Sequence, residues 1–159
     1  MEKFFILATI IEHLRGWIRV NYFIFPNQEN DFASNNNQKI LHIPSNINHE
    51  SQICDLYEHG LNFPSYFGKN WDALLDCLRD LSFVKEKNIL ITHKDIPFKN
   101  DEESKHIYIE ILFDAVTRWL EFPEHKFYIY FPDTCRTEIT RIIEASRYQW
   151  LGPELGCWV

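Results

Sequence analysis

The residues whose chemistry stands out are carboxylates at helical spacing near the middle of the chain. Asp72 and Asp76 are four positions apart, and Asp80 follows after another four. On a helix, this spacing places the carboxylates on one face, about one turn apart. Such a pair can act as acid and base, or it can present negative charge to a cationic partner. A solvated face without a function is the alternative, because charged faces are usual on amphipathic helices.

A thiol–imidazole pair is the other arrangement that could do chemistry. Cys77 with His93 or His106 would resemble the pair that activates a cysteine nucleophile. Cys77 lies inside an apolar pattern, however, where a packed and inert thiol is the more frequent role. The sequence has neither a C-x-x-C pair nor an H-x-x-H or H-E-x-x-H pattern, so it indicates no metal site, no cofactor and no catalytic residue. We expect reduced, buried thiols at the four cysteines, which are Cys54, Cys77, Cys135 and Cys157.

Apolar periodicity predicts the helix that holds these carboxylates, over residues 71–81. Its apolar side consists of Trp71, Leu74, Leu75, Leu78 and Leu81, and Arg79 is the cation among the acids of the opposite side. Asn70 is the expected N-cap. Residues 63–68 bring a proline, a glycine and aromatic residues together, which predicts a tight turn before the helix.

Strands and helices alternate around this helix, which predicts an α/β fold with a parallel sheet. Apolar runs over residues 39–43, 89–92 and 126–131 have the length of buried strands, and residues 21–26 alternate well enough for a further strand. Helical spacing predicts one helix from an Asn48 or Ser51 cap to Gly60, and others over residues 106–122 and 134–147. The polar tract over residues 27–38 predicts a loop or linker.

Length and composition restrict the class of protein. The chain has 159 residues, of which 45% are apolar, and this suits one soluble domain with a substantial core. Its net charge of −7 repels nucleic acid phosphates and anionic membranes, and no basic patch offsets that charge. The apolar run at residues 4–11 is shorter than the roughly 20 residues of a transmembrane helix, and no signal cleavage pattern follows it. We therefore expect a cytoplasmic protein that binds a basic partner and contacts neither nucleic acid nor membrane.

One continuous segment, residues 63–78, bears a family resemblance. It consists of Phe-Pro-Ser-Tyr-Phe-Gly-Lys-Asn-Trp-Asp-Ala-Leu-Leu-Asp-Cys-Leu. A proline two positions before an aromatic pair, and then Gly-x-Asn-x-Asp-Ala-Leu-x-Asp-Cys-Leu, closely resembles the central segment of the barstar-like family, which comprises intracellular inhibitors of bacterial ribonucleases. The order of strands and helices over residues 39–131 also agrees with that family.

This resemblance implies an α/β fold in which helices pack a three-stranded parallel sheet, within a single domain over residues 1–159. The family-like core spans about residues 39–133, and residues 1–38 and 134–159 are N- and C-terminal extensions. The resemblance also implies a non-enzymatic immunity protein, monomeric when free, that binds a basic ribonuclease toxin one to one. A regulatory or scaffold module on the same fold is the alternative function, and a Cys/His-dependent enzyme is a distant third.

Inhibitors of this family place the acidic helix and the turn before it in the nuclease active site, where carboxylates replace substrate phosphates. The matching positions imply the partner-binding residues Tyr66, Gly68, Asn70, Trp71, Asp72, Leu75 and Asp76, with Asp76 as the phosphate mimic. The chain departs from the family at Trp71 and Leu75, where the family has an aliphatic and a large aromatic residue, and at Lys69, where it has an acid. The resemblance does not fix which acid of residues 106–122, if any, joins this surface.

Overall fold

The computed structural model describes residues 23–24, 37–122 and 124–150, with side chains described for residues 37–122 and 124–146. Its elements, in chain order, are β1 (Phe23–Ile24), β2 (Gln38–Ile43), α2 (Glu50–Leu61), α3 (Trp71–Asp80), β3 (Asn88–His93), α4 (Glu102–Trp119), β4 (Lys126–Tyr130), the short 3₁₀ helix η1 (Asp133–Cys135) and α5 (Arg136–Trp150). The alternation of strands and helices confirms the predicted α/β class.

The strands form one parallel sheet in the order β1-β4-β3-β2. Strands β2, β3 and β4 are the three-stranded parallel core that the sequence predicts. They pair along most of their length, with Leu41 opposite Ile91 and Ile91 opposite Ile129. Strand β1 adds a short fourth strand, in which Phe23 pairs with Ile129. The strand expected within residues 21–26 is therefore present, and it extends the sheet beyond β4.

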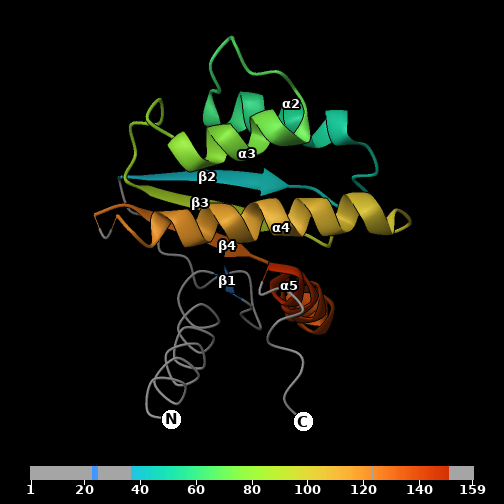
Figure 1. Ribbon diagram of the computed structural model, residues 1–159. Helices are drawn as coiled ribbons and strands as arrows, with labels where there is room; N and C mark the ends of the chain where they lie inside the picture. Colours follow the sequence, from blue (N-terminus) through green and yellow to red (C-terminus); the bar gives the residue numbers. More distant parts are fainter. Residues whose placement is uncertain (1–22, 25–36, 123, 151–159) are drawn as a thin grey trace, which may run out of the picture.

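Each helix packs against a neighbouring strand or helix. Helix α2 packs against β2, α3 packs against α4, and α4 contacts both β4 and α5. Figure 1 shows α2 and α3 on the β2 side of the sheet and α5 on the side of β4 and β1, with α4 running between them. Among the helices of the described residues, none combines the length and the apolar character that crossing a bilayer requires.

A chain of hydrogen bonds runs through the core between α2, α4 and the sheet. His93 Nδ1 donates to the carbonyl oxygen of Tyr130 at 3.0 Å, so Nε2 accepts the Tyr108 hydroxyl at 2.7 Å, and Tyr108 in turn accepts the Tyr57 hydroxyl at 2.9 Å. All three side chains are buried, and the His93 ring stacks on Phe131 with centroids 3.9 Å apart. Burial lowers the pKa of His93 to about 3, so the ring is neutral.

Several helix boundaries differ from those that the sequence predicts. Helix α4 ends at Trp119 and not at residue 122, and α5 spans Arg136–Trp150 and not residues 134–147, because η1 takes up Asp133–Cys135. The starts of α2 and α4 also differ. His49 is the N-cap of α2, not Asn48 or Ser51, because the Gln52 side chain accepts hydrogen bonds from the backbone of Asn48 and His49, each at 3.0 Å. Helix α4 starts about one turn before residue 106, at Glu102. Its cap is Asp101, which accepts the Ser104 backbone N–H at 3.1 Å.

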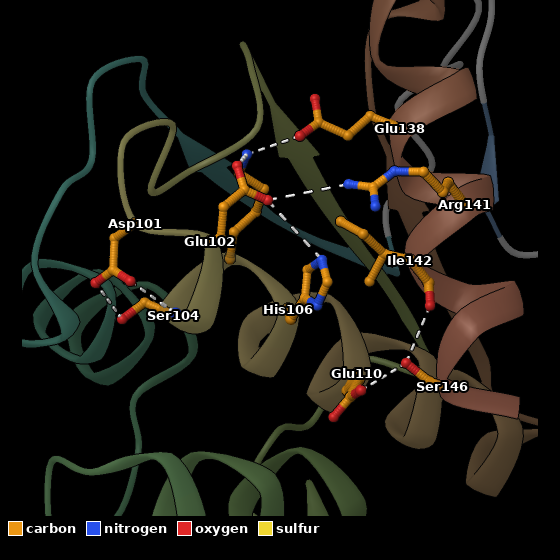
Figure 2. Close-up of polar contacts among 10 residues, drawn as sticks. Asp101, Glu102, Ser104, His106, Glu110, Glu138, Arg141, Ile142 and Ser146 are labelled. Atoms are coloured by element: carbon orange, nitrogen blue, oxygen red, sulfur yellow. Dashed lines mark hydrogen bonds and ion pairs between the residues drawn. The ribbon is translucent and has the colours of Figure 1, made fainter. Parts of the chain in front are cut away.

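Helix α5, which the sequence assigns to the C-terminal extension, is fixed to α4 by buried polar contacts. Lys105 of α4 is 4% exposed and donates to Glu102 at 2.6 Å and to Glu138 of α5 at 2.7 Å. Further along α5, Ser146 donates to Glu110 of α4 at 2.5 Å. Figure 2 shows Glu138 and Arg141 pointing from α5 toward the first turn of α4, where Glu102 lies. Because the buried Lys105 ammonium is paired with two carboxylates, its charge is tolerated at the interface of the two helices.

Candidate functional site: an acidic helix and the turn before it

Helix α3 is held by a cap at each end and by its buried face. The side chain of Asn70, the predicted N-cap, accepts the Ala73 backbone N–H at 2.8 Å. At the other end, the Leu81 N–H donates to the Cys77 carbonyl oxygen. The indole N–H of Trp119 on α4 donates to the Leu78 carbonyl oxygen at 2.8 Å. Its termini and its contact with α4 therefore fix the outer face of the helix.

That outer face presents Asp72 and Asp76 to solvent, one turn apart. Among the described residues, neither carboxylate has an ion pair or a side-chain hydrogen bond. Asp72 lies in the first turn, where the helix dipole favours a negative charge, whereas Asp76 lies beyond it. The charge of Arg79 acts on Asp76 at longer range, but it forms no ion pair or hydrogen bond with this carboxylate.

Arg79, the cation of α3, binds an acid of the neighbouring helix α4. Arg79 forms two hydrogen bonds with Asp114 of α4, from Nε to Oδ1 at 2.7 Å and from Nη2 to Oδ2 at 2.8 Å. These bonds raise the pKa of the Arg79 guanidinium and hold this group against α4. Asp114 is thus the acid within residues 106–122 that the structure places beside α3. Glu110 bonds Ser146, and Glu121 pairs with Arg118.

The turn before α3 combines a buried base with an exposed tip. Phe63 and Phe67 are buried, with ring centroids 4.9 Å apart, and the Phe67 N–H donates to the Pro64 carbonyl oxygen at 2.9 Å. Between them, Tyr66 is 74% exposed, an unusual state for so large an aromatic side chain. A Cβ atom added at Gly68 would meet the side chains of Asn70 and Ala73 at 3.4 and 3.5 Å, so an alanine would fit there.

Lys69 follows Gly68 and turns toward α2, away from the acidic face. Its ammonium donates to Asp55 at 2.9 Å and lies 2.8 Å from Glu58. The two carboxylates, Glu58 first, raise the pKa of Lys69 above its ordinary value. The backbone of Lys69 is left-handed, with a φ of 52°, a conformation that residues other than glycine rarely adopt.

Trp71 and Leu75, the two departures from the family pattern on α3, are half-buried and pack against the core. The Trp71 ring lies 5.5 Å from Phe98 and 6.3 Å from Tyr108, measured between centroids. Both side chains therefore help to seat the helix, while parts of their surfaces stay open beside Asp72 and Asp76.

The thiol–imidazole pair gains no support from the geometry. Cys77 is 5% exposed, and burial, followed by the charges of Asp80 and Asp76, raises the pKa of its thiol. His93 already uses both ring nitrogens in the core network. Cys54, Cys77 and Cys135 are free and buried, as predicted, and Cys157 lies outside the described residues. Thiols that are buried and protonated are poor nucleophiles.

The sequence revealed the acids of α3 and the aromatic turn, but it did not reveal their neighbours on other helices. Only folding brings Asp114 next to α3. It likewise brings Asp55 and Glu58 next to the turn before α3. Local spacing could have indicated that Asp55 and Glu58 share one face of their helix. It contains no signal that Lys69 would bind them. The arrangement as a whole presents negative charge and one exposed aromatic ring, which is a surface suited to a cationic protein site.

Comparison with known proteins yields one family. The family model described as "Barstar (barnase inhibitor)" matches residues 38–132, more than half of the chain. The match begins at the first residue of β2 and ends two residues after β4, so it includes the whole three-stranded core together with α2, α3 and α4. No curated protein sequence matches the chain.

Proposed function

Because this chain belongs to the barstar family of barnase inhibitors, we propose that it blocks the active site of a basic bacterial ribonuclease with α3 and the turn before it. The observation that carries the proposal is a pair of exposed carboxylates, Asp72 and Asp76, which form no ion pair or side-chain hydrogen bond with the described residues and follow a turn whose aromatic ring, Tyr66, is 74% exposed.

The contact surface in this proposal consists of Tyr66, Gly68, Asn70, Trp71, Asp72, Leu75 and Asp76. Ribonuclease active sites hold phosphate oxygens with cationic side chains, so Asp76 takes the place of a phosphate and binds them through charge-assisted hydrogen bonds. Tyr66 supplies a rigid aromatic anchor. Asn70 acts through the cap that fixes the first turn, and the open edges of Trp71 and Leu75 exclude water around the charges.

In the cell, the same contact would serve an immunity protein. The protein is monomeric in the cytoplasm and forms a one-to-one complex with the toxin before the nuclease reaches cellular RNA. The net charge of −7 supports this role, since it accelerates encounter with a basic protein.

Cleavage of RNA by a panel of basic bacterial ribonucleases that includes barnase tests the proposal. We expect one nuclease at least to be silenced at one molecule of inhibitor per molecule of enzyme. Asp76→Ala should weaken that inhibition about thirtyfold, which corresponds to roughly 2 kcal/mol. Glu124→Ala, which removes an exposed charge beyond the end of α4, is the matched control and should inhibit like the wild type.

Failure of a hundredfold molar excess to slow any nuclease of the panel would refute the proposal and leave a regulatory or scaffold module on this fold. Survival of bacteria that express the inhibited nuclease tests the immunity role. Cells with the wild-type chain should grow, and cells with Asp76→Ala should not.

A further inference from the structure

Lys69 is a basic residue beside the surface that we propose binds a basic partner. It is a cation next to the acidic helix, and its left-handed backbone is unfavourable for a side chain of its type. Strained backbone persists only where surrounding contacts determine it. The contacts that do so here are the two carboxylates of α2, at 2.9 and 2.8 Å from the ammonium.

We propose that Lys69 is a positioning residue of the binding surface, which clamps the turn before α3 onto α2 through Asp55 and Glu58. This proposal rests on the proposed function. The clamp holds the turn at the residue between Gly68 and the Asn70 cap, so it fixes both Tyr66 on one side and the first turn of α3 with Asp72 on the other. It also directs the positive charge toward α2, and it occupies Asp55 and Glu58, so that these acids do not act as phosphate mimics.

The other contacts that anchor the turn lie at its two ends. Phe63 and Phe67 fix its start in the core, and Asn70 fixes its end on α3. Between them, Ser65, Tyr66, Gly68 and Lys69 are all exposed. Within the described residues, the bonds from Lys69 are the ion pairs that join this exposed stretch to another helix. Removing the ammonium therefore frees the part of the turn that presents Tyr66.

The direction in which Lys69→Met changes the affinity for the nuclease distinguishes a positioning role of Lys69 from a purely electrostatic one. Lys69→Met makes the protein more negative and releases two carboxylates, so electrostatic attraction alone would tighten binding to a basic nuclease. A lost clamp weakens binding instead, because the partner must then order the turn. We expect the dissociation constant to rise about fivefold, because the two exposed ion pairs that hold the turn are lost.

Two matched variants complete the binding measurement, made with barnase or with the panel nuclease that the wild-type chain inhibits. Lys85→Met makes the same charge change at an exposed lysine beyond the other end of α3, and it should bind as tightly as the wild type or more tightly. Lys69→Arg keeps both acids paired and should bind within about twofold of the wild type. Binding of Lys69→Met that equals or exceeds that of Lys85→Met would overturn the proposal.

Amide hydrogen exchange tests the clamp without any partner. In Lys69→Met, the Phe67 and Ala73 amides, which are bonded within the turn and cap, should exchange about fivefold faster, whereas the Ile91 amide in the sheet should be unchanged. Unchanged exchange at Phe67 and Ala73 would show that Lys69 does not hold the turn. If the wild-type chain binds no nuclease, the proposed function fails, and the exchange rates alone decide whether the clamp exists.

Discussion

Arg79 and Asp114 face each other across the contact between α3 and α4, and two parallel hydrogen bonds of 2.7 and 2.8 Å join their planar groups. Sequence spacing places Arg79 among the acids of its own helix, and its charge does attract Asp76. Its hydrogen bonds, however, go to an acid of a different helix. Asp76 therefore keeps its carboxylate free of hydrogen bonds and ion pairs with the described residues, although the charge of Arg79 still attracts it, while Arg79 joins α3 to α4.

The first prediction concerns this pair. A double-mutant cycle with Arg79→Met and Asp114→Asn should give a coupling free energy of about 0.5 to 1 kcal/mol, because the pair is bidentate but its side chains are 45% and 37% exposed. Chemical denaturation of the four proteins measures it. Additive effects of the two changes would show that the pair contributes nothing to the joining of α3 and α4.

The second prediction separates function from stability at Asp76. Asp76→Ala should leave the melting temperature unchanged or raise it slightly, because Ala favours helix and one of three repelling charges is removed. The same change should weaken nuclease binding by at least about 2 kcal/mol, because the cations of the partner lose their counter-charge. Thermal unfolding and titration calorimetry measure the two effects, with Asp72→Ala and the double variant alongside.

A less stable Asp76→Ala protein with unchanged affinity would reverse this assignment. It would place the carboxylate among the groups that hold the fold, and the phosphate-mimic role would be lost.

The third prediction concerns the rate of encounter with the nuclease. Association should slow steeply as salt rises from low to physiological concentration, while dissociation changes little, because salt screens long-range attraction more than it screens a buried contact. Stopped-flow fluorescence measures both rates. An association rate that ignores salt would contradict electrostatic steering by the charge of −7.

The fourth prediction follows from the buried imidazole of His93. Its pKa in the folded protein is lowered to about 3, against about 6.5 when unfolded, so the unfolded chain binds the extra proton between these values. The stabilising effect is thus complete above pH 6.5 and is lost as pH falls. By pH 5 the loss should reach about 2 kcal/mol. Denaturation measured from pH 7 to about 5 stays above the range where Asp101 and Glu102, whose pKa values are lowered, add their main dependence.

His93→Gln is the control for this pH dependence. Glutamine does not titrate, so the variant should be less stable at neutral pH but should lose far less stability between about pH 6.5 and 5. Parallel curves for the two proteins would assign the titration to another group.

The fifth prediction concerns the thiols. Burial raises the pKa of Cys54 to about 11, and the pKa values of Cys77 and Cys135 are also raised. In a Cys157→Ser background, a thiol reagent at pH 8 should therefore react slowly with the native protein and rapidly with three groups after unfolding. Replacing all four cysteines should preserve nuclease inhibition apart from some loss of stability. A rapidly labelled native thiol, or a folded variant without activity, would reopen the thiol-enzyme interpretation.

The sequence predicts most reliably the parts of this fold that local chemistry determines. Asn70 caps α3 as expected because its side chain reaches an amide three residues away, and the three buried strands are evident from their apolar runs. The start of α4 was missed because Asp101 and Ser104, which form its cap, precede the apolar periodicity that defines the helix.

The contacts of the site could not be predicted because they join residues that are distant in the sequence. Arg79 had acids one turn away on its own helix, and only the packing of α3 on α4 brings Asp114 closer. Likewise, the charge of Lys69 could have faced the acids of α3, and the left-handed backbone turns it toward α2 instead. Sequence spacing identifies which charges exist, while tertiary structure decides which of them remain available.

The order of the strands also sets an order of events during synthesis. Strand β2 pairs with β3, and β3 pairs with β4, so this core can assemble stepwise as it leaves the ribosome. Strand β1 is made first, yet its pairing partner Ile129 lies near the opposite end of the described chain. Strand β1 therefore cannot form this pairing until β4 has been synthesised. We expect its docking to be the last step of folding, after the family core with its acidic helix has formed.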